Sequence, residues 1–183
     1  MSSVAPIKIG VISDTHGFLD PKVLKLFAGV ERILHAGDIG SDGIIAELEA
    51  VAPVTAVLGN TDSSPNSRLT EVVALAGRKF LVYHIVNPRA LNEDLRLRIA
   101  RARPDAVVFG HTHKAFCETI DGVLYLNPGY AGKPKFGTER SIVILHCDEK
   151  EMRPEPQRHS VQPPFSGSRL ERAWPRASRP PSQ

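Results

Sequence analysis

Two histidines separated by one residue follow a short apolar run, and this spacing suits a metal site. The run ends at Phe109, and Gly110, His111, Thr112 and His113 come directly after it. Imidazole is the commonest side-chain ligand of metal ions in proteins. Where Thr112 turns the chain, both rings reach inward, and each ring can bind a different ion.

Other potential metal ligands occupy the same kind of position, a loop that directly follows an apolar run. Five such loops carry the candidates, which are Asp14, His16, Asp38, Asn60, His84, His111 and His113. A glycine directly precedes three of them and permits both a sharp turn and a close approach to a ligand. In open α/β sheets, ligands bind beyond the carboxyl ends of the strands. We therefore expect these side chains to meet at one end of the molecule.

The chemistry of this set favours two divalent ions. Carboxylate, imidazole and amide ligands suit Mn²⁺, Fe²⁺ or Zn²⁺, and the absence of cysteine ligands disfavours a structural zinc site. The candidates outnumber the ligands that one ion takes, whereas two ions that share Asp38 use all of them. Ions about 3.5–4 Å apart suit phosphoryl chemistry, because both the attacking and the leaving oxygen are stabilised. We expect Mn²⁺, with Fe²⁺, Ni²⁺, Zn²⁺ and Mg²⁺ as alternatives.

Each candidate also has an explanation that involves no metal. Asp14 alone is compatible with a loop cap, Asp38 with a turn residue after Gly37, and Asn60 with a turn former. His84 alone is compatible with a hydrogen-bonded histidine of the core. The occurrence of all the candidates after apolar runs favours the dinuclear site over these separate explanations.

Alternating strand and helix patterns must position these loops. The expected strands cover residues 7–13, 32–35, 54–58, 106–109, 115–120, 123–126 and 141–146, with a hairpin over 69–83. Helices are expected from Pro21, from a cap at Ser41 or Asp42, and over 92–101. The last three strands follow one another in the manner of a meander. This order predicts a layered α/β protein with two packed sheets and helices outside them.

The composition is that of one globular domain. Of the 183 residues, 42% are hydrophobic, which is enough for one buried core. No run approaches the roughly 20 apolar residues that cross a bilayer. The first residues lack the layout of a secretion signal, and Cys117 and Cys147 match neither a disulfide framework nor a zinc site. We therefore expect a cytoplasmic protein with buried, reduced thiols and no membrane partner.

The net charge of +3 is not spread evenly over the chain. Acidic and basic residues balance up to residue 150, so the excess of arginine lies in residues 151–183. A neutral body argues against a nucleic-acid-binding face. Residues 151–183 are rich in proline, arginine and serine and show no apolar periodicity. We expect this segment to be a disordered tail, with residues 1–150 forming the domain.

The candidates belong to motifs that resemble those of a known family. The motifs are Asp14-Thr15-His16, Gly37-Asp38, Gly59-Asn60-Thr61-Asp62, His84, Gly110-His111-Thr112-His113 and Asn127-Pro128-Gly129. In this order they resemble the calcineurin-like metallophosphoesterases, and more narrowly the small YfcE-type phosphodiesterases, over residues 7–147. The resemblance implies a four-layer αββα sandwich, in which two mixed sheets are flanked by helices.

The same resemblance assigns the ligands to two ions. The first ion takes Asp14, His16, Asp38 and His113, and the second takes Asp38, Asn60, His84 and His111. A hydroxide that bridges the ions then attacks phosphorus in line. Asp62 is expected to orient a ligand or its loop, with a plain turn cap as the alternative. The residues expected to carry catalysis are Asp38, Asn60, His84 and Asp62.

The chain departs from the family pattern at three places, none of which removes a metal ligand. Relatives usually have His-Gly-His where this chain has His84, Ile85 and Val86, and the second histidine of the relatives lines the substrate pocket. Many relatives have a histidine that can protonate the leaving group in place of Thr61, and often a serine in place of Tyr130. These departures concern substrate identity and rate.

We therefore expect a metal-dependent phosphodiesterase that hydrolyses a small phosphodiester. The alternative is a metal-binding scaffold for protein contacts with little activity, as in a retromer coat subunit that has this fold. The intact ligand set favours the enzyme, since a site that no longer catalyses a reaction is expected to lose some of Asp14, His16 or His113. Nucleic-acid binding through the tail is disfavoured because the body is neutral. Whether the protein forms a homo-oligomer is left open by the sequence.

Overall fold

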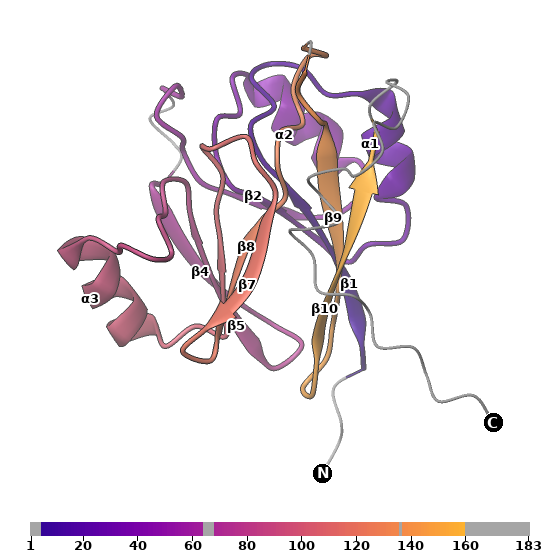
Figure 1. Ribbon diagram of the computed structural model, residues 1–183. Helices are drawn as coiled ribbons and strands as arrows, with labels where there is room; N and C mark the ends of the chain where they lie inside the picture. Colours follow the sequence, from indigo (N-terminus) through magenta and orange to yellow (C-terminus); the bar gives the residue numbers. More distant parts are fainter. Residues whose placement is uncertain (1–4, 64–67, 136, 160–183) are drawn as a thin grey trace.

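Two mixed five-stranded sheets form the centre of the molecule (Figure 1). The computed structural model describes residues 5–63, 68–135 and 137–159. The first sheet has the order β10-β9-β1-β2-β3, with strands Met152–Arg158, Ser141–Cys147, Ile7–Ile12, Arg32–His35 and Val54–Ala56. The second has the order β4-β5-β6-β8-β7, with strands Thr70–Leu75, Arg78–Tyr83, Ala106–Val108, Val123–Asn127 and Phe116–Ile120. In each sheet three neighbouring strands run parallel, β1-β2-β3 and β5-β6-β8, so their carboxyl ends lie together.

Helices cover the outer faces of the two sheets. Helices α1 (Pro21–Leu26) and α2 (Asp42–Glu49) pack on the first sheet, and α3 (Glu93–Ala102) packs on the second. Side-chain caps fix where the helices begin, because they accept hydrogen bonds from first-turn N–H groups, and the capping residues are Asp20, Ser41 and Asn92. Among the described residues, no helix has the length and apolar character needed to cross a membrane.

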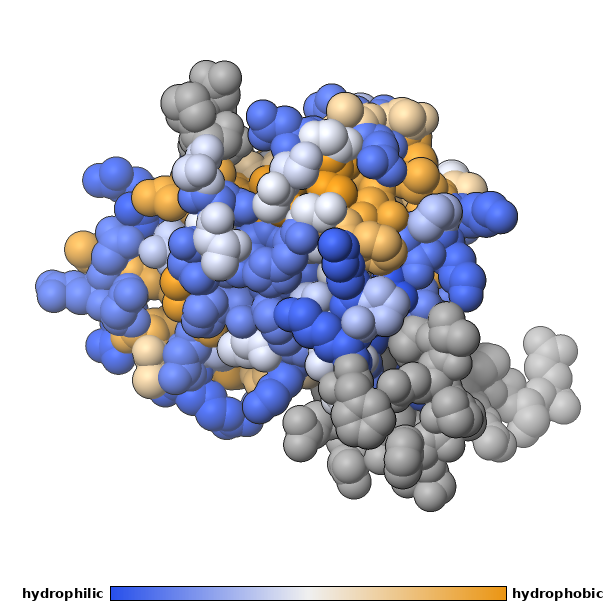
Figure 2. Space-filling model, turned by 90° about the horizontal axis from the view of Figure 1, so that it is seen from above, coloured by the Kyte–Doolittle hydropathy of each residue, from blue (hydrophilic) through white to orange (hydrophobic). Residues whose placement is uncertain are grey.

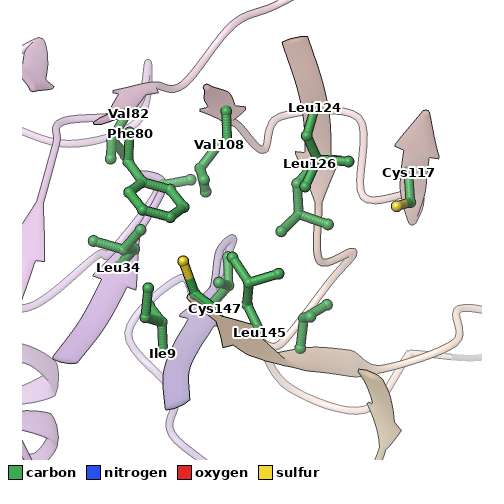
Figure 3. Packing of buried hydrophobic residues seen from close by; sticks show 14 of the residues in the cluster. Ile9, Leu34, Phe80, Val82, Val108, Cys117, Leu124, Leu126, Leu145 and Cys147 are labelled. Atoms are coloured by element: carbon green, nitrogen blue, oxygen red, sulfur yellow. The ribbon is translucent and has the colours of Figure 1, made fainter. Parts of the chain in front are cut away.

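The inner faces of the two sheets meet in an apolar core. Figure 3 shows Ile9 and Leu34 of the first sheet opposite Phe80 and Val108 of the second. Cys117 and Cys147 lie in the same core as free, buried thiols, in agreement with the sequence-based expectation. The layers therefore follow the order helix, sheet, sheet, helix, and the predicted four-layer sandwich is confirmed.

The predicted meander is wrong in its last strand. Strands β7 and β8 form a hairpin, but β9 crosses to the first sheet and pairs antiparallel with β1. All but one of the residues of β9 are buried. A strand that is buried on both faces needs a neighbour on each side and a packed layer above and below. The position between β1 and β10 provides these, whereas the order of the strands along the chain does not reveal it.

The disorder predicted for residues 151–183 is wrong for the residues that form β10, which lies in this segment. Every residue of β10 pairs with β9 in antiparallel register. The sequence did not predict this strand because it contains Pro154 and Pro156. Proline cannot donate a hydrogen bond to a neighbouring strand and occurs in strands mainly at sheet edges. The two prolines are two residues apart, so both missing N–H groups fall on the same side of this edge strand. Residues 160–183 lie outside the described residues, and their disorder stays a prediction.

Truncation after Lys150 is expected to destabilise the protein, because it deletes β10 and exposes the edge of β9. Met152 packs against the core between the sheets, and His159 is only 3% exposed. We expect the melting temperature to fall by about 5 °C or more, since each 1 kcal/mol corresponds to about 2–4 °C for a chain of this size. Truncation after His159 keeps β10 and serves as the control. Equal melting temperatures for the two truncated proteins would contradict this account of β10.

Candidate metal centre

The loops that follow the parallel strands converge at the upper end of the molecule in Figure 1. Figure 2 views this end, where hydrophilic side chains occupy much of the central area. The first two loops are joined along their backbones, since the N–H of Asp14 donates to Gly37 O at 3.0 Å and that of His16 to Asp38 O at 2.9 Å. The second sheet joins them because the His111 N–H donates to the carboxylate of Asp14 at 3.2 Å. The centre is therefore built from both sheets.

Four of the seven candidates form a first ligand group, which consists of Asp14, His16, Asp38 and His113. Each offers one ligand atom, and these atoms all lie within 4.8 Å of one another. The Nε2 atoms of His16 and His113 are 3.1 Å apart, and His113 Nε2 is 3.4 Å from Asp14 Oδ1. Atoms that bind one ion at about 2.0–2.2 Å lie about 3 Å from one another. The spacing of this group therefore fits a single ion.

A second ligand group consists of Asp38, Asn60, His84 and His111. Its carboxylate oxygen is Asp38 Oδ1, which lies 3.4 Å from His84 Nε2, whereas Oδ2 faces His16 of the first group at 3.7 Å. Asn60 Oδ1 and His111 Nδ1 are 2.8 Å apart, and the rings of His84 and His111 have centroids 5.4 Å apart. The structure thus brings all seven candidates together, and Asp38 lies between the two groups.

One nitrogen atom of the second group has no hydrogen-bond partner among the residues that the structure describes. His84 is 3% exposed, and its Nδ1 lies 2.6 Å from the carbonyl oxygen of Ala36. Nδ1 therefore carries the proton, and the unpaired, buried Nε2 presents its lone pair toward Asp38. Burial lowers the pKa of His84, although the hydrogen bond to Ala36 acts to raise it. The lowered pKa favours the neutral ring. Buried polar atoms in proteins normally have partners, and a cation between this lone pair and the carboxylate would satisfy both.

Two buried carboxylates give the centre its negative charge. Burial raises the pKa of Asp14 to about 7, against a hydrogen bond from Ser13 that lowers it. Burial also acts to raise the pKa of Asp38, but hydrogen bonds from Thr61 and the nearby His84 and His16 together hold that pKa below its ordinary value. A nearby cation favours the charged form of a buried carboxylate. Divalent ions therefore complement both the charge and the spacing of these ligands.

Most of the ligand loops place their side chains with a left-handed backbone. Positive φ angles occur at five of the candidates, namely Asp14 (56°), His16 (47°), Asp38 (53°), His111 (69°) and His113 (56°). A residue with a side chain is disfavoured in this conformation by about 1–2 kcal/mol. Such residues persist where the surrounding structure holds them, and they cluster at functional sites.

Glycines permit the close approach of these loops, as the sequence suggests. A Cβ atom at Gly110 would overlap Ser13 Oγ and come within 2.7 Å of Asp14 Oδ2. A Cβ atom at Gly59 would overlap the backbone and carboxylate of Asp38. The glycines before Asn60 and His111 are therefore required by packing within the centre.

Comparison with known families agrees with this geometry. Residues 7–150 match the family model of the calcineurin-like phosphoesterase superfamily domain. The chain belongs to this superfamily.

Relatives of this phosphoesterase carry related names. A probable metallophosphoesterase of Methanothermobacter thermautotrophicus is 37% identical over 154 residues, which cover 79% of this chain and 88% of the relative. The phosphodiesterase YfcE of Escherichia coli is 30% identical over 173 residues, which cover 78% of this chain and 89% of YfcE. A solved structure of Vps29 from Entamoeba histolytica matches with a TM-score of 0.67 at 20% identity, covering 84% of this chain and 100% of that one. The likeness to Vps29 shows the fold alone.

Asp62 of the phosphoesterase joins the loops that carry Asp38 and Asn60. Its carboxylate accepts hydrogen bonds from the N–H groups of Ile39 at 3.0 Å, Gly40 at 2.8 Å and Gly59 at 2.9 Å. Two of these bonds cross from one loop to the other, which a plain turn cap does not do. The contacts favour the expected role in orienting a ligand loop.

One departure from the family pattern has a different meaning in the structure. The sequence suggests that Val86 replaces a histidine of the substrate pocket. Val86 is 5% exposed and packs with Leu81 and Leu95 between the second sheet and α3, while the neighbouring Ile85 is 47% exposed. The change to valine therefore fills an apolar cluster of the phosphoesterase fold, and in this structure it does not line the centre.

The sequence did not predict that Tyr130 and Lys135 lie beside the centre. Tyr130 is 1% exposed, and its ring centroid lies 4.8 Å from that of His113 and 6.0 Å from that of His16. Lys135 Nζ lies 4.9 Å from the centroid of the same ring. The tyrosine after Asn127-Pro128-Gly129 is visible in the sequence, but the loop that brings Lys135 back has no pattern to predict it. A cation therefore stands beside the first ligand group.

Proposed function

We propose that this phosphoesterase hydrolyses phosphodiesters at a centre that holds two divalent metal ions, with Mn²⁺ as the first choice. The observation that carries the proposal is the placement of Asp38, which presents Oδ2 to His16 and Oδ1 to His84. One carboxylate therefore serves both ligand groups, as a shared ligand must. The name of YfcE, a phosphodiesterase that is 30% identical to this chain, supports the choice of diesters.

The side chains of the protein have defined tasks in this reaction. When bound, the ions would lower the pKa of water and offset the negative charge of a phosphate. The Thr61 N–H donates to Asp38 Oδ1 at 2.9 Å and so fixes the carboxylate that the two groups share. The Ala36 carbonyl fixes the ring of His84 at 2.6 Å with its free nitrogen toward the centre. Asp62 holds the loops at a constant distance. This fixed arrangement orients the phosphate for in-line attack.

A pocket whose lining includes Ile39 and Thr61, the residues that follow Asp38 and Asn60 in the sequence, offers space for one ester group of the substrate. Its volume is about 250 Å³, and it lies between residues 39–45, which end in α2, and residues 58–63. Its described lining contains no lysine or arginine, and Asp42 and Asp62 contribute carboxylates. A negatively charged ester group is disfavoured there, so we expect the group to be uncharged or cationic.

The alternative function is a scaffold that binds metal and contacts other proteins with little catalysis. The likeness to Vps29 concerns the fold alone. In this chain both carboxylates, the asparagine and all four histidines converge on one centre. A scaffold has no need of this full set, and the enzyme is therefore the better supported function.

Metal content and turnover test the proposed function together. The purified protein is expected to bind two equivalents of Mn²⁺ and to hydrolyse an activated aryl phosphodiester. Excess chelator is expected to abolish turnover, because carboxylate and neutral imidazole ligands bind the ion only in deprotonated form and release it to a stronger ligand. Mn²⁺ is also expected to raise the melting temperature, since it binds the folded state. Full turnover in excess chelator would falsify the proposal, and tight Mn²⁺ binding without turnover would support the scaffold.

The remaining expectations about partners stay predictions. They are a small phosphodiester as substrate, a cytoplasmic location and no role in nucleic-acid binding, while a homo-oligomer stays open. Size-exclusion chromatography with light scattering tests the last of these directly.

A further inference from the structure

Two threonines occupy equivalent places in the centre. Thr15 separates the two candidate ligands of the first loop, and Thr112 separates those of the loop after β6. In both loops the residues on either side of the threonine have positive φ angles. Each threonine therefore lies between two residues whose backbones are disfavoured and must be held in place.

A buried histidine of the first sheet forms a hydrogen bond with Thr15. His35 is the last residue of β2 and is 0% exposed. The N–H of Gly37 donates to His35 Nδ1 at 3.2 Å, so the ring proton is on Nε2, which lies 3.0 Å from Thr15 Oγ1. The hydroxyl of Thr15 in turn donates to Ile39 O at 3.0 Å. This chain of bonds joins the loop that carries Asp14 and His16 to both sides of Asp38.

A buried asparagine holds Thr112 in the same manner from the second sheet. Asn127 is the last residue of β8 and is 0% exposed. Its Nδ2 donates to Gly110 O at 2.8 Å and to Thr112 Oγ1 at 3.2 Å, while its Oδ1 accepts from the Gly129 N–H at 2.9 Å. Both donor hydrogens of the amide therefore contact the loop that carries His111 and His113.

The two arrangements share a physical logic. In each, a buried polar side chain at the carboxyl end of a strand donates to the hydroxyl of a threonine between two ligands. A loop with two left-handed residues relaxes toward ordinary backbone angles unless its middle is held. The first ligand group draws its members from both loops, so relaxation of either loop separates ligand atoms that must lie about 3 Å apart.

We propose that His35 and Asn127 are positioning residues for the metal centre, which act through the hydroxyl groups of Thr15 and Thr112 to fix the ligands on either side. The inference rests on the metal centre of the proposed function, but it concerns metal affinity and not turnover. Groups that orient metal ligands typically contribute about 10–100-fold to metal affinity or activity.

Paired substitutions separate the hydroxyl from the shape of each threonine. Thr15→Val and Thr112→Val keep the branched side chain and remove the hydroxyl, whereas Thr15→Ser and Thr112→Ser keep the hydroxyl. His35→Asn keeps an acceptor near the Gly37 N–H but does not reach Thr15. His146→Asn is the matched control, because His146 lies on β9 and contacts Glu155 on the neighbouring edge strand. Mn²⁺ affinity is measured by isothermal titration calorimetry, and the melting temperature of each metal-free protein is measured beside it.

The valine variants and His35→Asn are expected to bind Mn²⁺ about 10–100-fold more weakly than the wild type. The serine variants and His146→Asn are expected to stay within about threefold, which corresponds to less than 1 kcal/mol. His35→Asn combined with Thr15→Val is expected to lose no more affinity than Thr15→Val alone, because Thr15→Val already removes the bond between Thr15 and His35.

Three results would overturn the proposal. They are valine variants that bind Mn²⁺ as the wild type does, serine variants that lose as much affinity as valine variants, and losses for His35→Asn and Thr15→Val that add. Where Thr15→Val fails to fold, the pair at Thr112, an exposed residue, decides by the same criteria. Wild-type protein that binds Mn²⁺ but hydrolyses no diester would refute the proposed function alone, and the affinity comparison would still decide this inference.

Discussion

Replacement of Asp38 by asparagine is expected to lower kcat/KM for an aryl phosphodiester by about 10³-fold, which corresponds to a loss of several kcal/mol of transition-state stabilisation. The physical reason is the position of Asp38 between the two ligand groups, with one oxygen facing each. Asparagine keeps the shape and an acceptor for the Thr61 N–H, but it removes the negative charge that two cations would share. The backbone tolerates the change, because φ is 53° at this residue and asparagine accepts left-handed angles.

Asp121→Asn is the matched control for this substitution. Asp121 is exposed, lies in the turn between β7 and β8, and has a φ of 49°. Both variants are expected to melt within about 3 °C of the wild type in the absence of metal, which is less than about 1.5 kcal/mol for this chain length. Turnover is measured with saturating Mn²⁺, and bound metal is counted in each protein. An Asp38→Asn protein with wild-type turnover and two bound ions would show that the shared carboxylate is not needed.

A preference for diesters over monoesters is the second large effect that we expect, with kcat/KM higher by about 10²-fold for the aryl diester than for the matching monoester. A missing proton donor reduces the rate on poor leaving groups by about 10²–10⁴-fold. At the place where many relatives have a histidine this chain has Thr61, whose backbone N–H and side chain both bond to Asp38. A threonine hydroxyl is a poor acid, and this one is already engaged.

Charge acts in the same direction, because a monoester dianion brings more negative charge than a diester. Lys135 is a cation beside the first ligand group, but the pocket between residues 39–45 and 58–63 has a lining with carboxylates and no described lysine or arginine. Thr61→His is expected to reduce the ratio of kcat/KM for the diester to kcat/KM for the monoester. Thr119→His, at an exposed position of β7, is expected to leave this ratio unchanged. Both substrates are compared under saturating Mn²⁺. A monoester preference in the wild-type protein would refute the substrate assignment and leave the metal centre intact.

The sequence by itself determined which residues are candidates for the centre. Each candidate follows an apolar run that proves to be a strand or its end, and the strands that carry most of them are parallel within their sheets. Parallel strands place their carboxyl ends on one side, so polar residues at the ends of such runs meet without any knowledge of side-chain contacts. The glycines before Asn60 and His111 were predictable for a similar reason, since their role depends on the local backbone.

Tertiary structure alone decided the features that depend on distant neighbours. Strand β9 lies in the first sheet because burial on both faces requires β1 and β10 beside it, and a run of apolar residues does not name its partners. Val86 points into the cluster under α3 rather than into the centre, a choice that the packing of the second sheet makes.

The same reason applies to the residues that hold the ligands. The residues around His35 are those expected around any histidine of a protein core. Nothing in the sequence around Thr15 distinguishes it from other loop threonines. Their bond joins residues 20 positions apart, and the bond between Asn127 and Thr112 joins residues 15 apart. A candidate ligand is recognised by the chemistry of its own side chain, so residue type and spacing predict it. The groups that orient ligands act through geometry between chain segments, and only the folded structure brings those segments together.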